Sequence, residues 1–418
     1  MGFEPTRAAG LDRLTDFLPR AGRAYANNRN YDDGVSDNGI RRNVSQLSPW
    51  LHSGLIKESE VLDAVLRQHS ADAADKFIAE VFWRVYFKGY LEQRPGIWRA
   101  YCEGRDRALD GIEANAGLRT AYEAAVAGST GIEAFDHWAR ELASTGYLHN
   151  HARMWFASIW VFTLKLDWHL GADLFLRQLI DGDAASNTLS WRWVGGLHTK
   201  GKTYLARPDN IARYTANQPG GPLAAQGLAS DAPALEEPGE HPRQRLDLPP
   251  APDRAAFAQP YALLLHDEGA SHVPLNLPSP PALVIGAARP EARSPLPTSE
   301  AATHFADTAV EGGVSAAAAA FACPGIDWPT DRPLADILGQ AGIERLALPY
   351  LPIGWTRDAL IPQIAPLAQQ GRVTDLLPAI DRETWPHARA GFFGVKKKVG
   401  PILDDLGISA SPTLFAAE

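Results

Sequence analysis

The sequence lacks several features that mark specialised classes of protein. It has only two cysteines, Cys102 and Cys323, which lie far apart and form no CxxC pair. They therefore allow neither a disulfide framework nor a four-cysteine metal or iron–sulfur site. The start of the chain lacks the apolar core of a secretory signal, and the most apolar run, MWFASIWVFTL, is too short to cross a membrane. These absences predict a cytoplasmic protein without a membrane partner or a bound metal.

An excess of basic charge is also missing. The formal net charge is -9, and residues 1–218 hold 26 basic and 26 acidic side chains, whereas 219–418 hold 14 and 23. An acidic total disfavours non-specific binding of polyanions, although a local basic groove is compatible with it. The 418 residues suffice for two domains, and nine of the twelve tryptophans fall in the first part. We therefore expect an aromatic-rich site in the first domain.

The pattern of apolar residues divides the chain into three parts. In residues 1–218 apolar side chains recur at three- and four-residue spacing, which predicts a mostly helical domain. Residues 219–259 are rich in Pro, Gly and Ala, which is typical of a linker or of a chain lying over a surface. Residues 260–418 alternate short apolar runs with helix-like stretches, which predicts a smaller α/β domain with a parallel sheet. The runs expected to form strands are YALLLH, PALVIGA, RLALPYL and RVTDLLPAI.

No sequence in the α/β part marks a nucleotide site, because neither a GxGxxG nor a Walker pattern opens any of its helices. The candidate sites therefore lie in the first part.

A helix is expected to begin near His149, with Asn150, Arg153 and Met154 on one face. The residues after it are apolar almost all round, so the helix should be buried and its polar face should have partners. A buried guanidinium requires a carboxylate, and either Asp181 or Asp183 could supply it to Arg153. A structural salt bridge and a pair that binds a ligand explain this pattern equally well.

The segment NVSQLSPWL predicts a short helix with Ser48 as the N-cap and Pro49 at the first helical position. Its free backbone N–H groups and the hydroxyls of Ser45 and Ser48 would suit a phosphate, although most helix starts of this kind bind nothing.

Several large aromatic side chains accompany these polar residues. In EVFWRVYF, Glu80, Trp83 and Arg84 lie on adjacent helical turns and could line one pocket wall, or could simply belong to an amphipathic core helix. Each tryptophan near the two aspartates is explained by itself as a core side chain.

Taken together and in this order, these segments resemble the FAD-binding helical domain of the photolyase/cryptochrome family. The resemblance covers roughly Leu11 to Thr215. It is carried by YANNRN, NVSQLSPWL, EVFWRVYF, STGYLHNHARM and LDWHLGADLFLRQLIDGDAASNTLSWRW.

The resemblance implies FAD as the cofactor, with its phosphates at Ser45, Leu47 and Ser48. Val44 stands where most relatives have threonine, and Asn187 falls on the position that faces flavin N5. The complete set implied to surround the cofactor is Tyr25, Ser45, Leu47, Ser48, Arg84, Asn150, Arg153, Asp181, Asp183 and Asn187.

The resemblance also implies an electron-transfer chain and a substrate face. Trp191 and Trp168 match the first two members of the chain that photoreduces the flavin, whereas the third position falls on Asn115, so we expect Tyr122 or another tryptophan to replace it. The residues implied to contact a flipped pyrimidine dimer are Glu80, Trp83, Met154 and Trp193. Val85 stands where a second acid is common.

The expected function is light-driven, FAD-dependent repair of cyclobutane pyrimidine dimers in UV-damaged DNA, with Glu80, Asn187, Trp191 and Trp168 taking part in catalysis. A cryptochrome-like photosensor that binds FAD and signals to a protein partner is the alternative, and a flavoprotein without either role is a third.

The main departure from the family is architectural. Family members usually begin with an α/β domain, whereas this sequence begins almost at the flavin domain, as do short bacterial photolyase-like proteins. The α/β part at 260–418 is either a rearranged counterpart or an unrelated addition, and a second chromophore is not implied.

Overall fold

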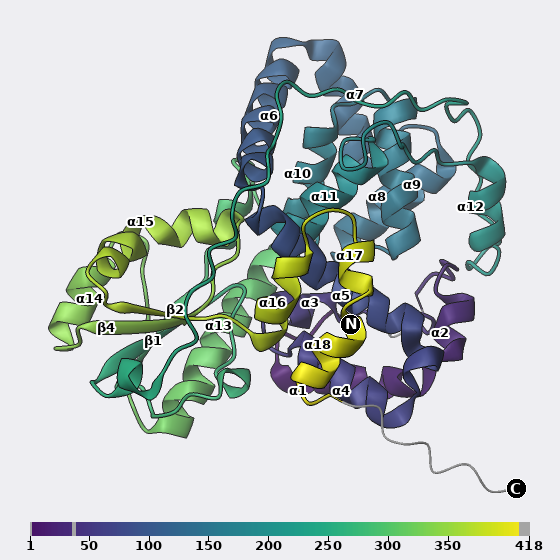
Figure 1. Cartoon of the computed structure of the whole chain (residues 1–418). Coiled ribbons are helices and arrows are strands. Elements are labelled where there is room, and N and C mark those ends of the chain that lie inside the picture. The colour runs from purple at the N-terminus through teal and green to yellow at the C-terminus, as the bar shows by residue number, and fades with distance from the viewer. Residues whose placement is uncertain (1, 36–38, 409–418) are drawn as a thin grey trace, which may run out of the picture.

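The computed structural model describes residues 2–35 and 39–408. A helical part is followed by an α/β part, and the last helices return to lie on the helical part (Figure 1). This arrangement confirms the predicted fold class, a mostly helical domain followed by a smaller α/β domain. No helix in the described ranges combines the length and the apolar character that crossing a membrane requires.

The helical part consists of twelve labelled helices within residues 7–214. Their bounds are α1 Arg7–Phe17, α2 Arg23–Asn28, α3 Ser48–His52, α4 Glu58–Gln68, α5 Ala71–Glu92, α6 Pro95–Ala114, α7 Ala116–Ala127, α8 Glu133–Thr145, α9 Asn150–Ser158, α10 Trp168–Gln178, α11 Ala184–Val194 and α12 Pro208–Tyr214.

The long helix α5 is the central support of this part. Ser70 caps its first turn by accepting a hydrogen bond from the backbone N–H of Ala73 at 3.3 Å. Its apolar side chains, among them Phe82 and Val85, are almost fully buried. It contacts α2, α4, α6 and α11, together with the C-terminal helices. Residues on α5 can therefore meet both parts of the chain.

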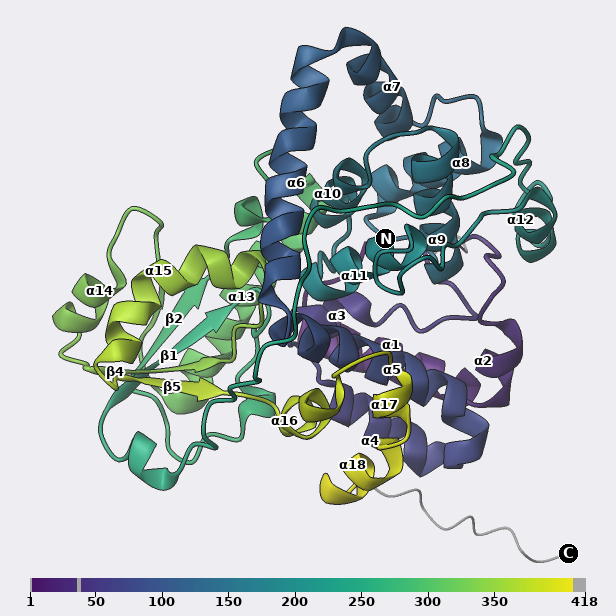
Figure 2. The same ribbon diagram turned by 45° about the horizontal axis from the view of Figure 1, so that its top comes forward.

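Residues 215–260 form a long connection with no strand and with only one short 3₁₀ turn, at Arg254–Phe257. The connection follows the helical part closely. The backbone N–H of Leu235 donates to the carbonyl of Gly195 at 2.9 Å, and that of Gln244 donates to the carbonyl of Gln93 at 2.8 Å. In Figure 2 it runs past α6 before it enters the sheet.

The α/β part is a parallel sheet with the strand order β3-β2-β1-β4-β5. Its elements are β1 Tyr261–His266, β2 Leu283–Ala287, α13 Glu300–Phe321, β3 Gly325–Asp327, α14 Leu334–Gln340, β4 Arg345–Pro349, α15 Trp355–Gln369 and β5 Val373–Leu376. Four of these strands fall in the predicted runs, whereas β3 is short, lies at the edge and was not predicted.

Both faces of the sheet are covered by helices. Leu263 and Leu265 pack in one cluster with α13 side chains such as Val310, whereas Leu264 packs on the other side with α14 and α15 side chains such as Leu360. The two central strands β1 and β2 are buried at every position, which explains their continuous apolar sequence.

After β5 the chain leaves the sheet and forms three short helices on the helical part, namely α16 Ala379–Thr384, α17 Phe393–Lys396 and α18 Val399–Asp405. Gln93 donates hydrogen bonds to the carbonyls of Trp385 and Ala388 at 2.9 and 3.2 Å. Tyr86 donates to the carbonyl of Ala390 at 2.7 Å. The sequence analysis placed these residues with the α/β domain, and in the structure they lie against α5.

Gly89 allows the C-terminal segment to approach α5, and replacing it should loosen this contact. A Cβ atom at this position would lie 2.5 Å from Cδ1 of Trp385. We expect Gly89→Ala to lower the free energy of unfolding by about 1–3 kcal/mol, the usual cost of overpacking. Chemical denaturation followed by circular dichroism measures the change.

Gly111→Ala is the matched control, because Gly111 also lies inside a helix but no atom would come within 4 Å of its Cβ. There alanine should stabilise the protein by about 0.5–1 kcal/mol through helix propensity. Equal effects of the two substitutions would show that the Trp385 contact is not tight.

Candidate functional site

Asp181 and Asp183 lie in the turn between α10 and α11. Asp183 is the N-cap of α11, and its side chain accepts a hydrogen bond from the backbone N–H of Ser186 at 2.7 Å. Gly182 between them has φ +30°, a value that side chains disfavour. Both aspartates are buried. The backbone of this turn therefore fixes two carboxylates that need cationic partners.

Arg84 of α5 is the partner of Asp183. Its Nη2 lies 2.9 Å from Oδ2 of Asp183, and its Nε donates to Oε1 of Glu58 at 3.1 Å. Burial alone would raise the pKa of Asp183, but Arg84, His52 and Lys88 together more than offset it, so the pKa lies well below its ordinary value. Asp183 therefore remains ionised in the folded protein.

Arg153 of α9 pairs with the other aspartate of the turn. Its Nη1 and Nη2 both lie 3.4 Å from Oδ2 of Asp181, and its Nε donates to the carbonyl of Leu148 at 3.0 Å. The guanidinium is 24% exposed, so it is less buried than the sequence suggested. Of the two partners that the sequence left open, the structure selects Asp181. Both nitrogens contact the same oxygen, so the pair lacks the two-oxygen fork geometry.

The segment expected to hold phosphates lies beside this turn. The helix α3 begins at Ser48 and Leu47 is its N-cap, so the prediction of Ser48 as the N-cap was wrong by one residue. The cause is the αR conformation of Leu47, which leaves no side-chain cap. Burial raises the pKa of Asp181, whereas the charge of Arg153 and a side-chain hydrogen bond from Ser48 lower it. The pKa lies below its ordinary value as a result.

Arg13 of α1 holds the backbone before α3 in place, and sequence reasoning missed it. It is buried, and its guanidinium donates to the carbonyls of Ser45, Val44 and Arg41 at 2.7, 2.9 and 2.8 Å. The Arg13 guanidinium thus fixes the loop that carries Ser45 through hydrogen bonds to the backbone carbonyls of that loop. The pattern of the surrounding residues offered no signal for this role.

Tyr25 and Glu80 lie on the α2 side of the site and share one neighbour. Glu80 forms an ion pair with Arg29, and burial raises the pKa of this carboxyl. Burial also raises the pKa of the Tyr25 phenol, and the negative charge of Glu80 raises it further. The ring of Tyr25 packs edge-on against Phe77 at 5.2 Å. Tyr25 and Glu80 are therefore both neighbours of Arg29, which is the cationic partner of Glu80.

Trp83 does not form an open pocket wall. Its ring stacks on that of Phe392 with centroids 4.1 Å apart and an interplanar angle of 15°. Phe392 directly precedes α17, so a residue from the far end of the sequence covers one face of Trp83. Sequence reasoning missed this contact, because nothing in the sequence links the two segments.

Three other predicted residues are accessible to solvent. Asn150 at the start of α9 is exposed, and Met154 and Trp193 are half-buried. The ring of Trp193 stacks on Tyr204 at 5.6 Å.

Asn187 of α11 is buried and its amide is anchored, because Nδ2 donates to the carbonyl of Ala172 at 2.8 Å. Trp191, one helical turn further on, is 2% exposed and its Nε1 makes no hydrogen bond within the described residues. Its ring lies edge-on to Trp160 at 6.3 Å and to Phe175 at 5.2 Å.

The aromatic neighbours of Trp191 and Trp168 differ. Trp160 contacts Tyr122 at 6.0 Å, whereas Trp168 contacts Tyr101 at 5.9 Å and Tyr101 contacts Trp98 at 5.2 Å. Trp191 and Trp168 therefore belong to two separate groups of aromatic rings, and Tyr122 belongs to the group of Trp191. Asn115, which interrupts the expected series, is exposed at the junction of α6 and α7.

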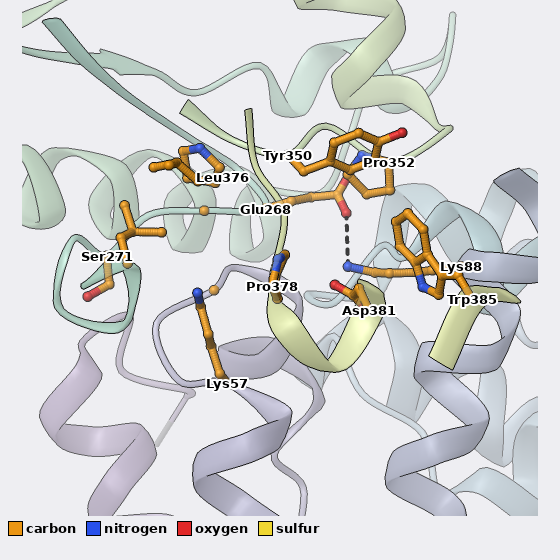
Figure 3. Close-up of a pocket in the computed structure, with 14 residues that line it drawn as sticks. Lys57, Lys88, Glu268, Ser271, Tyr350, Pro352, Leu376, Pro378, Asp381 and Trp385 are labelled. Carbon is orange, nitrogen blue, oxygen red and sulfur yellow. Dashed lines mark ion pairs between the residues drawn. The ribbon is translucent and has the colours of Figure 1, made fainter. Parts of the chain in front are cut away.

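Further buried charges continue from the aspartate turn towards the α/β part. Nδ1 of His52 lies 3.7 Å from Oδ2 of Asp183 and 4.0 Å from Oε2 of Glu268, and Nζ of Lys88 lies 3.5 Å from the same glutamate oxygen. Figure 3 shows this lysine and glutamate facing each other across a small pocket of about 50 Å³ between the two parts of the chain. Burial raises the pKa of Asp381 in this pocket to about 7. Within residues 2–35 and 39–408, no group of three or more His, Cys, Asp or Glu side chains is arranged to hold a metal.

The structure thus brings together Arg84, Arg153, Asp181, Asp183 and Ser48, which come from α3, α5, α9 and the turn before α11. Such a cluster of paired charges at the junction of several helices is suited to binding a polar cofactor.

Four of these five residues, Arg84, Arg153, Asp181 and Asp183, lie in a region that matches a known family. Residues 77–218 match the family described as the FAD binding domain of DNA photolyase. Residues 77–218 of the helical part thus resemble an FAD-binding domain of the photolyase type, and the chain is similar to members of the photolyase/cryptochrome family.

The similar proteins include two photolyases and one cryptochrome. A deoxyribodipyrimidine photo-lyase from Streptomyces griseus is 34% identical over 194 residues, which are 43% of this chain and 41% of the relative. One from Thermus thermophilus is 33% identical over 202 residues, 48% and 45% of the two chains. A cryptochrome DASH from Idiomarina loihiensis is 27% identical over 244 residues, 53% and 51% of the two chains. The chain thus spans about half the length of the curated relatives it matches.

Removing the cation from the Arg84 pair should strongly destabilise the fold. Arg84→Met leaves Glu58 and Asp183 buried without their partner, so we expect a loss of about 3–5 kcal/mol in the free energy of unfolding at neutral pH. Because the pKa of Asp183 is lowered in the folded protein, the loss should shrink as the pH falls below the ordinary aspartate value. Urea unfolding at several pH values measures both effects.

Arg67→Met is the control, because Arg67 pairs with Asp63 on the surface of α4, where it is 72% exposed. A loss of at most about 1 kcal/mol is expected there. If Arg84→Met cost no more than this control, the buried pair would not hold the helices together.

Proposed function

We propose that the protein is an FAD-dependent, light-driven DNA repair enzyme that splits cyclobutane pyrimidine dimers. The observation that carries the proposal is the pair of arginine–aspartate contacts, Arg84 with Asp183 and Arg153 with Asp181, inside the region that matches the FAD binding domain of DNA photolyase. The names of the photo-lyase relatives support the reaction, and their partial coverage leaves it a proposal.

The donors and acceptors at the site fit FAD. Nη2 of Arg84 and Oδ2 of Asp183 pair with each other at 2.9 Å, whereas both ring nitrogens of His52 are buried and make no hydrogen bond with the described residues. Such groups are costly unless a polar ligand satisfies them. The residues proposed to hold the cofactor are Tyr25, Ser45, Leu47, Ser48, Arg84, Asn150, Arg153, Asp181, Asp183 and Asn187. When bound and reduced, FAD supplies the electron that opens the dimer and recovers it afterwards.

The protein side chains orient the cofactor and shield it from water. The hydrogen bond of Asn187 to Ala172 fixes its amide plane, so its oxygen can face a cofactor atom in one orientation. Arg84 and Arg153 present positive charge to the negatively charged groups of the cofactor. The ionised Asp183 and Asp181 hold the two guanidinium groups in place.

Trp83 and Trp193, with Met154 and Glu80, are proposed to receive the damaged bases. A dimer has to leave the duplex to reach the cofactor, and aromatic faces compensate for the stacking that it loses. A local basic segment favours DNA as the partner, because five of the fourteen bases in 219–418 fall between Arg382 and Lys398, with Glu383 as the single acid there.

The contact between Trp83 and Phe392 favours the photosensor as a second candidate. A C-terminal segment that covers the substrate-side ring could transmit a change at the site to a protein partner. For repair, the same contact has to open before a base can stack on that face. The two candidates therefore differ in the role of Phe392.

The test of the proposed function is the repair of a defined lesion. Protein reconstituted with FAD and chemically reduced should remove a cyclobutane thymine dimer from an oligonucleotide under blue light, and not in the dark. Chromatography of the oligonucleotide measures the conversion. A wild-type protein that binds FAD but leaves the dimer intact would reject repair and favour the sensor.

Trp191→Phe serves as a control within this test. Phenylalanine fills the buried volume without the readily oxidised indole, so photoreduction of bound, oxidised FAD should slow at least about tenfold, whereas repair after chemical reduction should persist. Unchanged photoreduction would show that electrons arrive by a route that avoids Trp191.

Phe392→Ala distinguishes a covering residue from a signalling one. An aromatic pair contributes about 0.5–1.5 kcal/mol beyond its area, so uncovering Trp83 should raise the affinity for dimer-containing DNA about 2- to 10-fold without changing that for undamaged DNA. Fluorescence anisotropy with both DNAs at one salt concentration measures this change.

Phe393→Ala is the matched control, because Phe393 is the next residue but is 72% exposed. It should leave the preference for the lesion unchanged. A gain in affinity for both DNAs, or for neither, would show that Phe392 does not compete with a lesion for Trp83.

A further inference from the structure

Arg293 of the α/β part reaches into the aspartate turn of the helical part. It ends the short turn after β2, and it is 2% exposed. Its Nη1 donates to the carbonyls of Leu176 and Leu179 at 3.3 and 2.8 Å, and its Nη2 donates to that of Ile180 at 3.2 Å. These carbonyls belong to the end of α10 and to the first residues of the turn. A side chain from another domain thus caps this helix.

The ion pairs of the described residues do not include Arg293, and the carboxylates of Asp267, Asp181 and Glu268 act on its guanidinium only from a greater distance. Burial lowers its pKa, against the opposing charge of Asp267. The buried positive charge of Arg293 is compensated by the backbone carbonyls at the end of α10, which carry partial negative charge and favour a cation. Three carbonyls must therefore converge on one point, and a displaced turn would leave this cation unsatisfied.

Trp355, the first residue of α15, holds the next part of the same turn. Its Nε1 donates to the carbonyl of Gly182 at 2.9 Å, and the Arg293 guanidinium lies 5.0 Å from the centre of its ring. Its side chain is 1% exposed. A Cβ at Gly182 would lie 2.4 Å from Nη1 of Arg293, so the approach also requires glycine at this position.

We propose that Arg293 and Trp355 are positioning residues for the cofactor site, and that the α/β part thereby sets the affinity for FAD. This inference rests on the proposed function. The two side chains fix the carbonyls of Leu179, Ile180 and Gly182, which precede or separate the two aspartates. The backbone on either side of Asp181 is thus held from the α/β part. The carboxylate of Asp181 can then face Arg153, and that of Asp183 can face Arg84.

The experiment compares Trp355→Phe with Trp328→Phe. Trp328 is also buried in the α/β part, its Nε1 also donates to a carbonyl, that of Arg332 at 2.8 Å, and an arginine, Arg289, also lies over its ring at 5.2 Å. Each substitution removes one indole N–H and keeps an aromatic ring. Only Trp355 contacts the aspartate turn, so the pair separates positioning from general damage to the domain.

FAD affinity is measured by fluorescence titration of the apoprotein, together with the visible circular dichroism of bound FAD. One hydrogen bond contributes about 0.5–1.5 kcal/mol, so Trp355→Phe should weaken FAD binding about 2- to 10-fold and alter the dichroism. Trp328→Phe should change neither. Arg293→Met should weaken binding further, with Arg289→Met as its control.

Hydrogen–deuterium exchange of the apoprotein gives a readout that does not depend on FAD. The amides of residues 179–187 should exchange faster in Trp355→Phe than in the wild type or in Trp328→Phe. If the wild type bound no FAD, the proposed function would fail, and unchanged exchange in Trp355→Phe would then reject the positioning role as well. If the wild type bound FAD and both variants matched it in affinity and exchange, only the positioning inference would be overturned.

Discussion

The buried contact of Arg84 with Glu58 and Asp183 is the interaction on which the rest of the structure depends. It joins α4, α5 and the start of α11, and each of its three side chains would be costly to bury alone. The network does not stop there, because His52 and Lys88 connect it to Glu268, the second residue after β1. Charges from the helical part and from the α/β part therefore compensate one another, which explains why the two parts meet closely at this place.

The central position of α5 has a consequence for function. One side of this helix carries Arg84 and Lys88 to the charge network, whereas Trp83, Tyr86 and Gly89 meet the C-terminal segment. A shift of α5 would change both sets of contacts at once. The two proposed functions would therefore both draw on this mechanical connection through α5.

Local patterns were enough to predict most of the strands and the helical character of the first part, and the family resemblance named several residues that the structure brings together. The buried strands β1 and β2 are continuous apolar runs, and the cluster around Asp181 and Asp183 lies in the segments whose order carried the family resemblance. The sequence left two partners open for Arg153, since the choice between the aspartates depends on the path of the turn. The roles of Arg13, Phe392 and Arg293 were not predictable, because each acts on backbone or rings far away in the sequence and follows no periodic pattern.

The segments that follow β1, β2 and β4 all contact the helical part. In an open parallel sheet, ligands usually bind beyond the carboxyl ends of the strands, where the chain direction switches. In the order β3-β2-β1-β4-β5 the switch lies between β1 and β4. The segments that leave β1, β2 and β4 carry Glu268, Arg293 and Trp355, and all three contact the helical part. The end of the sheet at which open parallel sheets usually bind ligands thus contacts the aspartate turn of the helical part, through Arg293 and Trp355.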